Sequence, residues 1–548
     1  MSLHIYEDMA VPEDTVRVAK AAFPKGNSYL TLRDELGAVY ADESFAWLFV
    51  HRGRPAESPG VLALVTVLQF AEGLTDRQAA DAVRGRIDWK YLLGLDLTDP
   101  GFDYSILSDF RVRLVSGGVE QQLLDVLLER FKSRGLLKSR GRQRTDSTHV
   151  LCAVRVLNRL ECVGETMRQA LNALSGIAPL WVQAHVPVEW YKRYGPRFEQ
   201  YRLPKTETQR QALGLSVGAD GHLLLSWVYA PDTPSLIRTH PAVKVLRQVW
   251  VQQYQMQGDQ LLFRDTDKLP PAEKLIVSPY DPQARLSVKR QTEWTGYKVH
   301  VTETCDKEKP HLITHVATTP ATLPDNQMTG AIHSALEKKA LLPQEHFLDS
   351  GYLDADHLVT SQKEHAVELV GPVLGDTSWQ ARAQEGFDVS CFAMDWEGQK
   401  VTCPQGKLSR IWSESHDAFD NPVIHVRFSK ADCQACSCRE KCTRGKGPRT
   451  LHLRAKAQHD ALQKARQKQT SSEFEQRYKA RAGVEGTLSQ GTRVCGLRRT
   501  RYIGQAKTHL QHLLIAAAMN LARYVAWVKQ TPLTPTRVWP FAALAPAS

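Results

Sequence analysis

Long hydrophobic runs and cysteines are both scarce in this sequence. The most apolar late segment, residues 512–528, is interrupted by Asn520 and Arg523 and is too short to cross a bilayer. The first fifteen residues are acidic and contain no apolar run, which argues against a secretory signal peptide. Ten cysteines in 548 residues are too few for a disulfide scaffold and fit a reducing compartment. We therefore expect a folded cytoplasmic protein with no membrane partner.

Positive charge is concentrated in one stretch of the chain. Residues 439–507 contain 18 Lys or Arg and 5 Asp or Glu, a net charge of +13, whereas the whole chain carries +11. The remaining residues therefore sum to −2. A basic stretch of this kind favours a polyanionic partner, most simply nucleic acid, and a solvated helix face is the alternative.

The first part of the chain is patterned as helices. Residues 59–73 predict one helix and residues 74–95 a second, which begins with a capping box formed by Thr75 and Gln78. We predict an all-helical domain over residues 1–135. Such domains often bind DNA, and a plain helical bundle is the alternative.

Strand patterns begin after this region. The segment 144–150, RTDSTHV, is rich in β-branched residues, and residues 296–306 and 311–322 predict a β-hairpin around a charged turn. We predict an α/β fold with a core over 136–370 and a helical insert at about 153–256. The pattern then changes to short strands, turns and cysteines over 371–450, to long helices over 451–530 and to a loose tail over 531–548.

Three acidic residues stand at ends or faces of the predicted core elements. Asp146 lies within the first strand, and Asp349 ends a short apolar strand. Glu485 shares a helix face with Arg481. Taken singly, each acid is more simply explained as a structural group such as a turn cap. Three convergent carboxylates, however, suit Mg²⁺, and two such ions about 3.5–4 Å apart can stabilise the attacking and leaving oxygens of phosphoryl transfer.

Four segments carry a family resemblance. They are TDSTHV at 145–150, DPQARLSVKRQTEWTGYKVHVTETCD at 281–306, LDSGYLDADHL at 348–358 and YKARAGVEGTLSQGTRVCGLRRTRY at 478–502. These segments resemble the DDE transposases of bacterial insertion sequences, in particular the family numbered eleven eighty-two. The resemblance extends over roughly residues 30–525. It implies an RNase H-like catalytic core, a mixed sheet flanked by helices, that carries a β-rich insertion between the second and third acids.

The resemblance also implies an activity and a set of partners. The catalytic triad would be Asp146, Asp349 and Glu485, which would hold two Mg²⁺ ions or Mn²⁺ as a substitute. The enzyme would cleave the terminal inverted repeats of its element, which the N-terminal helices would recognise, and join them to target DNA. A homodimer would hold the two ends, and the protein would act at the bacterial nucleoid.

The resemblance and the basic stretch together indicate residues that contact DNA. The family pattern of Tyr, Arg, Glu and Lys is met by Tyr478, Arg481 and Glu485, whereas Thr492 stands where lysine is usual and Arg493 follows it. The expected DNA contacts are Tyr478, Arg481, Arg493, Arg498, Arg499 and Arg501.

A cysteine cluster occupies the predicted insertion. Residues 433–442 read CQACSCREKC, and Cys403 precedes them in VTCPQGK. Four thiolates can form a tetrahedral structural zinc site, and the ligands that we expect are Cys403, Cys433, Cys436 and Cys442. Cys438 is a rival ligand, and free thiols or a redox pair are the alternatives to zinc.

Several functions remain open from the sequence. A DNA transposase explains the acids, the basic stretch and the resemblance together. The alternatives are a metal-dependent DNA nuclease without strand transfer and an inactive DNA-binding relative. A zinc-ribbon interaction module would explain the cysteines but neither the acids nor the charge.

Overall fold

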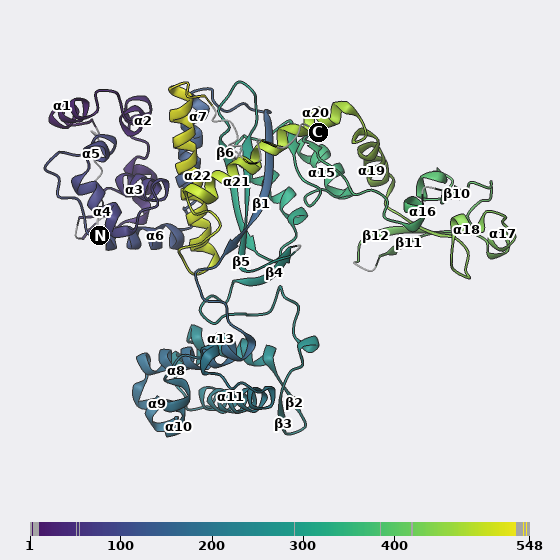
Figure 1. The fold of residues 1–548 in the computed structure, drawn as a ribbon, viewed down its shortest axis with the longest axis horizontal. Helices are drawn as coiled ribbons and strands as arrows, with labels where there is room; N and C mark the ends of the chain where they lie inside the picture. Colours follow the sequence, from purple (N-terminus) through teal and green to yellow (C-terminus); the bar gives the residue numbers. More distant parts are fainter. Residues whose placement is uncertain are drawn as a thin grey trace.

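The centre of the molecule is a six-stranded mixed sheet, seen in a computed structural model (Figure 1). Its strands are β1 (Arg142–Leu151), β4 (Arg285–Lys289), β5 (Thr292–Thr304), β6 (Ile313–Pro320), β7 (Glu345–Phe347) and β8 (Glu368–Val370). The structure describes residues 3, 10–50, 52–53, 55–289, 291–383, 385–417, 420–532, 541 and 544. The predicted tail at 531–548 therefore lies mostly outside the described residues.

Strand β1 runs through the middle of this sheet. It is antiparallel to β5 and parallel to β7, which is parallel to β8. On its other edge, β5 pairs antiparallel with both β4 and β6. The pairing of β5 with β6 confirms the predicted hairpin. Tyr297, Val299 and Val301 alternate into the hydrophobic core, as the period of two in their sequence requires. The predicted α/β class, with a mixed sheet flanked by helices, is confirmed.

Helices precede the sheet. They are α1 (Glu13–Ala22), α2 (Ser28–Leu36), η1 (Asp42–Leu48), α3 (Pro59–Ala71), α4 (Asp76–Gly85), α5 (Ile87–Leu93), α6 (Ser105–Gly117) and α7 (Gln122–Ser133). The capping box of Thr75 and Gln78 is present at the start of α4. The helix predicted over 74–95 is two helices, because Arg86 has an extended backbone and bonds to the Asp88 carboxylate.

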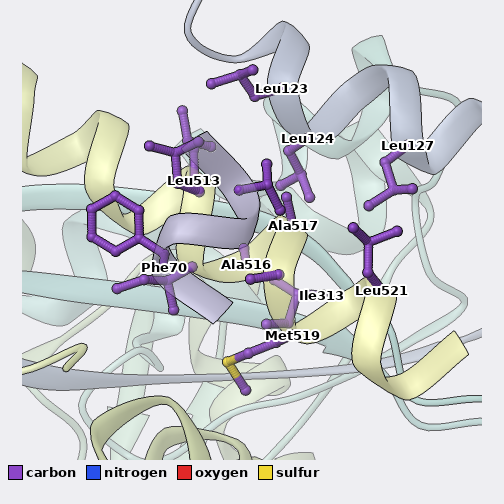
Figure 2. Packing of buried hydrophobic residues seen from close by; sticks show 14 of the residues in the cluster. Phe70, Leu123, Leu124, Leu127, Ile313, Leu513, Ala516, Ala517, Met519 and Leu521 are labelled. Carbon is purple, nitrogen blue, oxygen red and sulfur yellow. The ribbon is translucent and has the colours of Figure 1, made fainter. Parts of the chain in front are cut away.

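The N-terminal helices share one hydrophobic core with the sheet. The long helix α22 (Gln505–Val528) packs between them, against α3 and α7 on one side and β6 on the other. Figure 2 shows Leu124 and Leu127 of α7 facing Ala517 and Leu521 of α22, with Ile313 of β6 close by. Because α22 is apolar almost all round, it is buried by both layers. The helices and the sheet thus form a single packed body.

The segment between β1 and β4 forms a second body with its own core. Its elements are α8 (Arg159–Ile177), α9 (Pro179–His185), α10 (Val188–Tyr194), η2 (Gln200–Arg202), α11 (Glu207–Val228), α12 (Ser235–Arg238), α13 (Pro241–Gln253), β2 (Tyr254–Gln257), β3 (Gln260–Phe263) and η3 (Thr266–Lys268). Met167, Val217 and Leu246 are among its fully buried residues. Figure 1 shows this body below the sheet.

A third, smaller body follows β8. It contains α16 (Trp379–Arg382), η5 (Val389–Cys391), β9 (Ala393–Asp395), β10 (Lys400–Thr402), β11 (Ile411–His416), β12 (Pro422–Arg427), α17 (Lys430–Gln434), α18 (Arg439–Cys442) and β13 (Thr450–Leu453). Its short strands enclose a core that includes Phe392, Val426 and Phe428. Figure 1 shows it at the far right, away from the sheet.

The remaining helices lie before and after the third body in the chain. They are η4 (Asp325–Met328), α14 (Thr329–Lys338) and α15 (Ala355–His365) before the third body, and α19 (Lys456–Lys468), α20 (Ser472–Tyr478), η6 (Lys479–Ala482) and α21 (Gly483–Val494) after it. Among the described helices, none is both long and apolar enough to span a membrane.

Candidate active site

Asp146 lies in the middle of the central strand. Its residue is 9% exposed, and its partner across the sheet is Val301 of β5. The Ser147 amide donates to Asp146 Oδ1 at 2.8 Å, which fixes the carboxylate. A central strand with neighbours on both sides is rigid, so this carboxylate is held in one place.

Asp349 lies two residues beyond the end of β7, the parallel neighbour of β1. The Gly351 amide donates to Asp349 Oδ1 at 2.9 Å. Tyr352, in the same turn, attaches it to the sheet, because its buried hydroxyl lies 2.6 Å from His300 Nδ1 on β5. Parallel pairing of β1 with β7 therefore brings Asp349 to the same region of the sheet as Asp146.

Glu485 comes from the first turn of α21. Its side chain is 65% exposed, so it faces solvent instead of lying in an apolar stripe. The continuous helix that the sequence predicts here is interrupted by the 3-10 turn η6. Arg481 and Glu485 nevertheless lie on one face, as predicted, because Arg481, within that turn, donates to Glu485. Before the turn, Phe474 stacks on Tyr478.

Arg481 connects the three acids. Its Nη2 lies 2.7 Å from Asp146 Oδ2 and 4.0 Å from Asp349 Oδ2, and its Nη1 donates to Glu485 Oε1 at 2.9 Å. One guanidinium therefore lies within salt-bridge range of carboxylates from β1, the β7 turn and α21. The Nε atom of Arg481 is buried and has no hydrogen-bond partner among the described residues.

The electrostatics of the site show a shortage of positive charge. Burial, with a further contribution from the Asp349 carboxylate, raises the pKa of Asp146, although Arg481 opposes the shift. Burial also raises the pKa of Tyr478, and all three carboxylates lie near enough to affect this hydroxyl. Three carboxylates and one guanidinium leave a net charge of −2.

As the side chains lie, no set of three or more His, Cys, Asp or Glu among the described residues is arranged to hold a metal ion. In the acidic cluster the reason is visible, since Arg481 occupies the space between the carboxylates. The donor set itself, three carboxylates without thiols, is the kind that binds Mg²⁺.

A second ion pair borders the site and was not predicted from the sequence. Lys298 Nζ lies 3.0 Å from Asp325 Oδ1, and the Ser147 hydroxyl donates to Asp325 Oδ2 at 3.1 Å. The alternation of the hairpin placed Lys298 on the polar side of β5, which was the available signal. Nothing local to Asp325 distinguishes it from a turn residue.

The basic residues predicted to contact DNA have different surroundings. Arg498 Nε donates to Thr148 Oγ1 on β1 at 2.7 Å. Arg501 Nη1 donates to the Leu74 carbonyl at 2.6 Å, and its guanidinium lies over the Phe70 ring. Arg501 thus attaches the N-terminal helices to the segment after α21. Arg493 and Arg499 are both exposed on the surface.

Four cysteines of the third body line one pocket of about 340 Å³. Four of its lining residues are the predicted ligands Cys403, Cys433, Cys436 and Cys442. Backbone amides approach two of these sulfurs: Lys407 N lies 3.3 Å from Cys403 Sγ, and Arg449 N lies 3.5 Å from Cys433 Sγ. Burial raises the pKa of Cys442 to about 11, with contributions from its three cysteine neighbours. The rival Cys438 is not among the residues that line this pocket.

Comparison with known proteins gives two matches in separate parts of the chain. Residues 402–525 match the family model described as Transposase DDE domain, and residues 17–113 match the one described as Transposase domain (DUF772). No curated protein matches the chain. The sheet, in which β5 pairs with both β4 and β6 and the order continues β5, β1, β7, β8, is consistent with the RNase H-like core of a DDE transposase. The two matches indicate an insertion-sequence DDE transposase, as the resemblance predicted, and neither match tests the numbered family. DNA is accordingly its partner.

Proposed function

We propose that this protein cleaves the ends of a mobile element and joins them to target DNA by metal-dependent phosphoryl transfer. The observation that supports this is the convergence of Asp146, Asp349 and Glu485 on one guanidinium. Buried charges are usually paired or bind metal ions, whereas these three carboxylates share one guanidinium and leave a net charge of −2. A cluster with that imbalance and oxygen donors only is suited to divalent cations.

The three carboxylates would each bind the cations from a different element. Asp146 lies on β1 and Asp349 lies just beyond the parallel strand β7, so both would provide well-placed ligands, and Glu485 would complete the set from α21. Two Mg²⁺ ions, or Mn²⁺ in their place, would supply Lewis-acid activation of the water or 3′-OH nucleophile and stabilise the leaving oxygen.

Arg481 is the residue whose role changes when cations bind. Divalent cations among the carboxylates would replace its charge there and free the guanidinium. Its Nε is buried and has no partner among the described residues, so a guanidinium released from the carboxylates would bring an unused donor to a DNA phosphate. Tyr478, Arg493, Arg498 and Arg499 lie on the same basic segment and would extend the phosphate contacts, which position DNA without reading its sequence.

The test is cleavage of a labelled element end by the variants Asp146→Asn, Asp349→Asn and Glu485→Gln. Each variant keeps the side-chain shape and removes one charged ligand, so cleavage should fall by roughly a hundredfold or more while end binding persists. Asp356→Asn is the matched control, because Asp356 is an exposed acid on α15 outside the cluster. Cleavage at the wild-type rate in any triad variant would show that its carboxylate is not a ligand.

The same assay separates the alternatives. A transposase should convert the cleaved end into a joined product when target DNA is added, whereas a nuclease without strand transfer stops at the cleaved end. An inactive relative should bind ends but leave them intact with Mg²⁺ or Mn²⁺.

We also propose that the N-terminal helices recognise the terminal inverted repeats. A homodimer would hold the two ends. Because these helices share a core with α22, deleting them would expose that core. Surface substitutions are therefore the better test: Arg77→Ala on α4 should weaken preference for element ends over random DNA. Native mass spectrometry of the end complex should show two chains with two ends.

For the third body we propose a structural zinc site formed by Cys403, Cys433, Cys436 and Cys442. The shared pocket supports it, as do the amide donors to two sulfurs, since groups of this kind orient metal ligands. Purified protein should contain about one zinc per chain, because four thiolates complete one tetrahedral site. Cys403→Ser should lose the metal and Cys438→Ser should keep it; the reverse result, or no zinc in unchelated protein, would refute the assignment.

A further inference from the structure

A second charged cluster adjoins the candidate active site through β1 and α21. Its centre is Glu303 on β5, which is completely buried, and we refer to it as the Glu303 network. The network consists of Glu303, Arg144, Arg523 and Thr487. These residues come from β5, β1, α22 and α21 respectively, so one carboxylate connects two strands with two helices.

Every oxygen of Glu303 is bonded. Arg144 Nε donates to Oε1 at 2.7 Å, while Arg523 Nη1 and the Thr487 hydroxyl both donate to Oε2 at 2.6 Å. Arg523 Nη2 in turn donates to Thr487 Oγ1 at 2.6 Å, so the hydroxyl is fixed as a donor to Glu303. This arrangement satisfies a fully buried charge, which is otherwise very costly.

The network holds the segment that carries Arg481 and Glu485. Arg144 Nη1 donates to the Ala480 carbonyl of η6 at 2.6 Å. The first residue of α21, Gly483, lies directly against the same guanidinium: a Cβ at this position would come within 2.0 Å of Arg144 Nη1. The start of α21 is therefore fixed at Ala480 and Gly483 on one side of Glu485 and at Thr487 on the other.

The network is also in register with the acids. Arg144 and Asp146 are two residues apart on β1, so their side chains point to the same face of the sheet. Arg144 contacts the chain just before Arg481, and Asp146 contacts Arg481 itself. A shift of α21 along the sheet would break both contacts together.

We propose that the Glu303 network is a positioning device that sets the distance of Glu485 from Asp146 and Asp349. This inference rests on the proposed function, because it concerns the geometry of the same three carboxylates. It adds residues that touch neither DNA nor the reacting atoms. Their effect is on the cation affinity of the site and on the cleavage rate of bound DNA.

The first test replaces the Thr487 hydroxyl. Thr487→Val keeps the shape and removes the donor to Glu303, whereas Thr487→Ser keeps the donor. For Thr487→Val we expect the Mg²⁺ concentration for half-maximal cleavage to rise about tenfold or more, with end binding unchanged. Thr487→Ser should restore the wild-type value. Mn²⁺ binding to the DNA-free protein, followed by electron paramagnetic resonance, should weaken in parallel.

The second test uses two glycines on one helix. Gly483→Ala and Gly486→Ala each add a methyl group near the start of α21, but only the alanine at 483 meets Arg144, while a Cβ at 486 meets no described atom within 4 Å. Gly483→Ala should reduce cleavage and Mn²⁺ affinity, and Gly486→Ala should change neither. Equal behaviour of the two variants would overturn the positioning role.

The outcomes separate this inference from the function that it rests on. If wild-type protein cleaves DNA and Thr487→Val has the wild-type Mg²⁺ and Mn²⁺ dependence, the network is structural only and the function stands. If wild-type protein neither cleaves element ends nor binds Mn²⁺, the proposed function fails, and the positioning role fails with it. A loss of thermal stability without any change in cation dependence also counts against the inference.

Discussion

Glu303 and Asp146 are carboxylates on neighbouring strands of one sheet, and they differ in how their charge is matched. Glu303 is fully buried and has two arginines and a threonine hydroxyl to itself. Asp146 is nearly as buried but shares a single arginine with Asp349 and Glu485. The first arrangement is complete without any ligand, and the second is short of cations. We propose that this difference separates a carboxylate that holds the fold from carboxylates that take part in catalysis.

Removing the matched carboxylate should produce the largest loss of stability. Glu303→Gln leaves Arg144 and Arg523 buried without their counter-charge, which should lower the free energy of unfolding by about 3–5 kcal/mol. Asp349→Asn removes one of three mutually repelling acids and should leave stability nearly unchanged. Denaturant unfolding of both variants checks the contrast, and equal losses would remove the distinction between the clusters.

The two clusters should also respond to pH with opposite sign. Burial raises the pKa of Asp146 above its ordinary 3.8, so the folded state binds that proton more tightly and Asp146 costs stability as pH rises through its folded pKa. Burial alone would raise the pKa of Glu303 as well, but Arg523 and Arg144 hold it below its ordinary 4.5. Glu303 therefore contributes stability above pH 4.5 that is lost as pH falls through its folded pKa.

Chelator-treated protein should show this contrast. Relative to wild type, Asp146→Asn should gain stability as the pH rises from 3.8 towards neutrality. The stability deficit of Glu303→Gln should be constant above pH 4.5 and should shrink as the pH falls below 4.5. Unfolding midpoints measured on both sides of pH 4.5 provide the data. A Glu303→Gln deficit that shrinks as the pH rises, or an Asp146→Asn difference that does not grow, would show that the charge balance of the clusters has been misassigned.

Arginines of the basic stretch differ in a similar way, and replacing them should have a smaller effect, on the salt dependence of DNA binding. Arg493, Arg499 and Arg501 are all exposed, but Arg501 also donates to the Leu74 carbonyl and lies over the Phe70 ring. Replacing Arg493 or Arg499 by alanine should flatten the slope of log K for DNA against log salt by about 0.9 per lost phosphate contact. Arg501→Ala should leave that slope unchanged and loosen the N-terminal helices instead. Salt titrations of non-specific DNA binding measure both.

Local sequence signals were sufficient for much of the fold. The capping box at Thr75, the β5–β6 hairpin and the apolar helix α22 follow from propensity and periodicity, and the structure contains all three. The acids could be chosen because each ends or interrupts a recognisable element and because the family resemblance joined them.

Contacts between distant segments were beyond those signals. The residues KARA at 479–482 are good helix formers, and yet the helix changes to a 3-10 turn where Arg144 bonds the Ala480 carbonyl. The helical pattern near residue 254 gives way to the strand β2, where Tyr254 packs on Phe263. Glu303 reads as one polar position of a hairpin, because its partners lie more than 150 residues away along the chain. In each case contacts between distant segments determined the local structure or the partner, and periodicity along the chain does not contain that information.

We propose that Asp146, Asp349 and Glu485, which surround the Arg481 guanidinium, form a site for divalent cations. Mn²⁺ titration of DNA-free protein by electron paramagnetic resonance tests it most directly, with wild type, Asp349→Asn and the control Asp356→Asn compared side by side. We predict that wild type and Asp356→Asn bind Mn²⁺ with the same affinity and that Asp349→Asn binds about tenfold more weakly or worse. Equal Mn²⁺ affinity in all three proteins would contradict the claim.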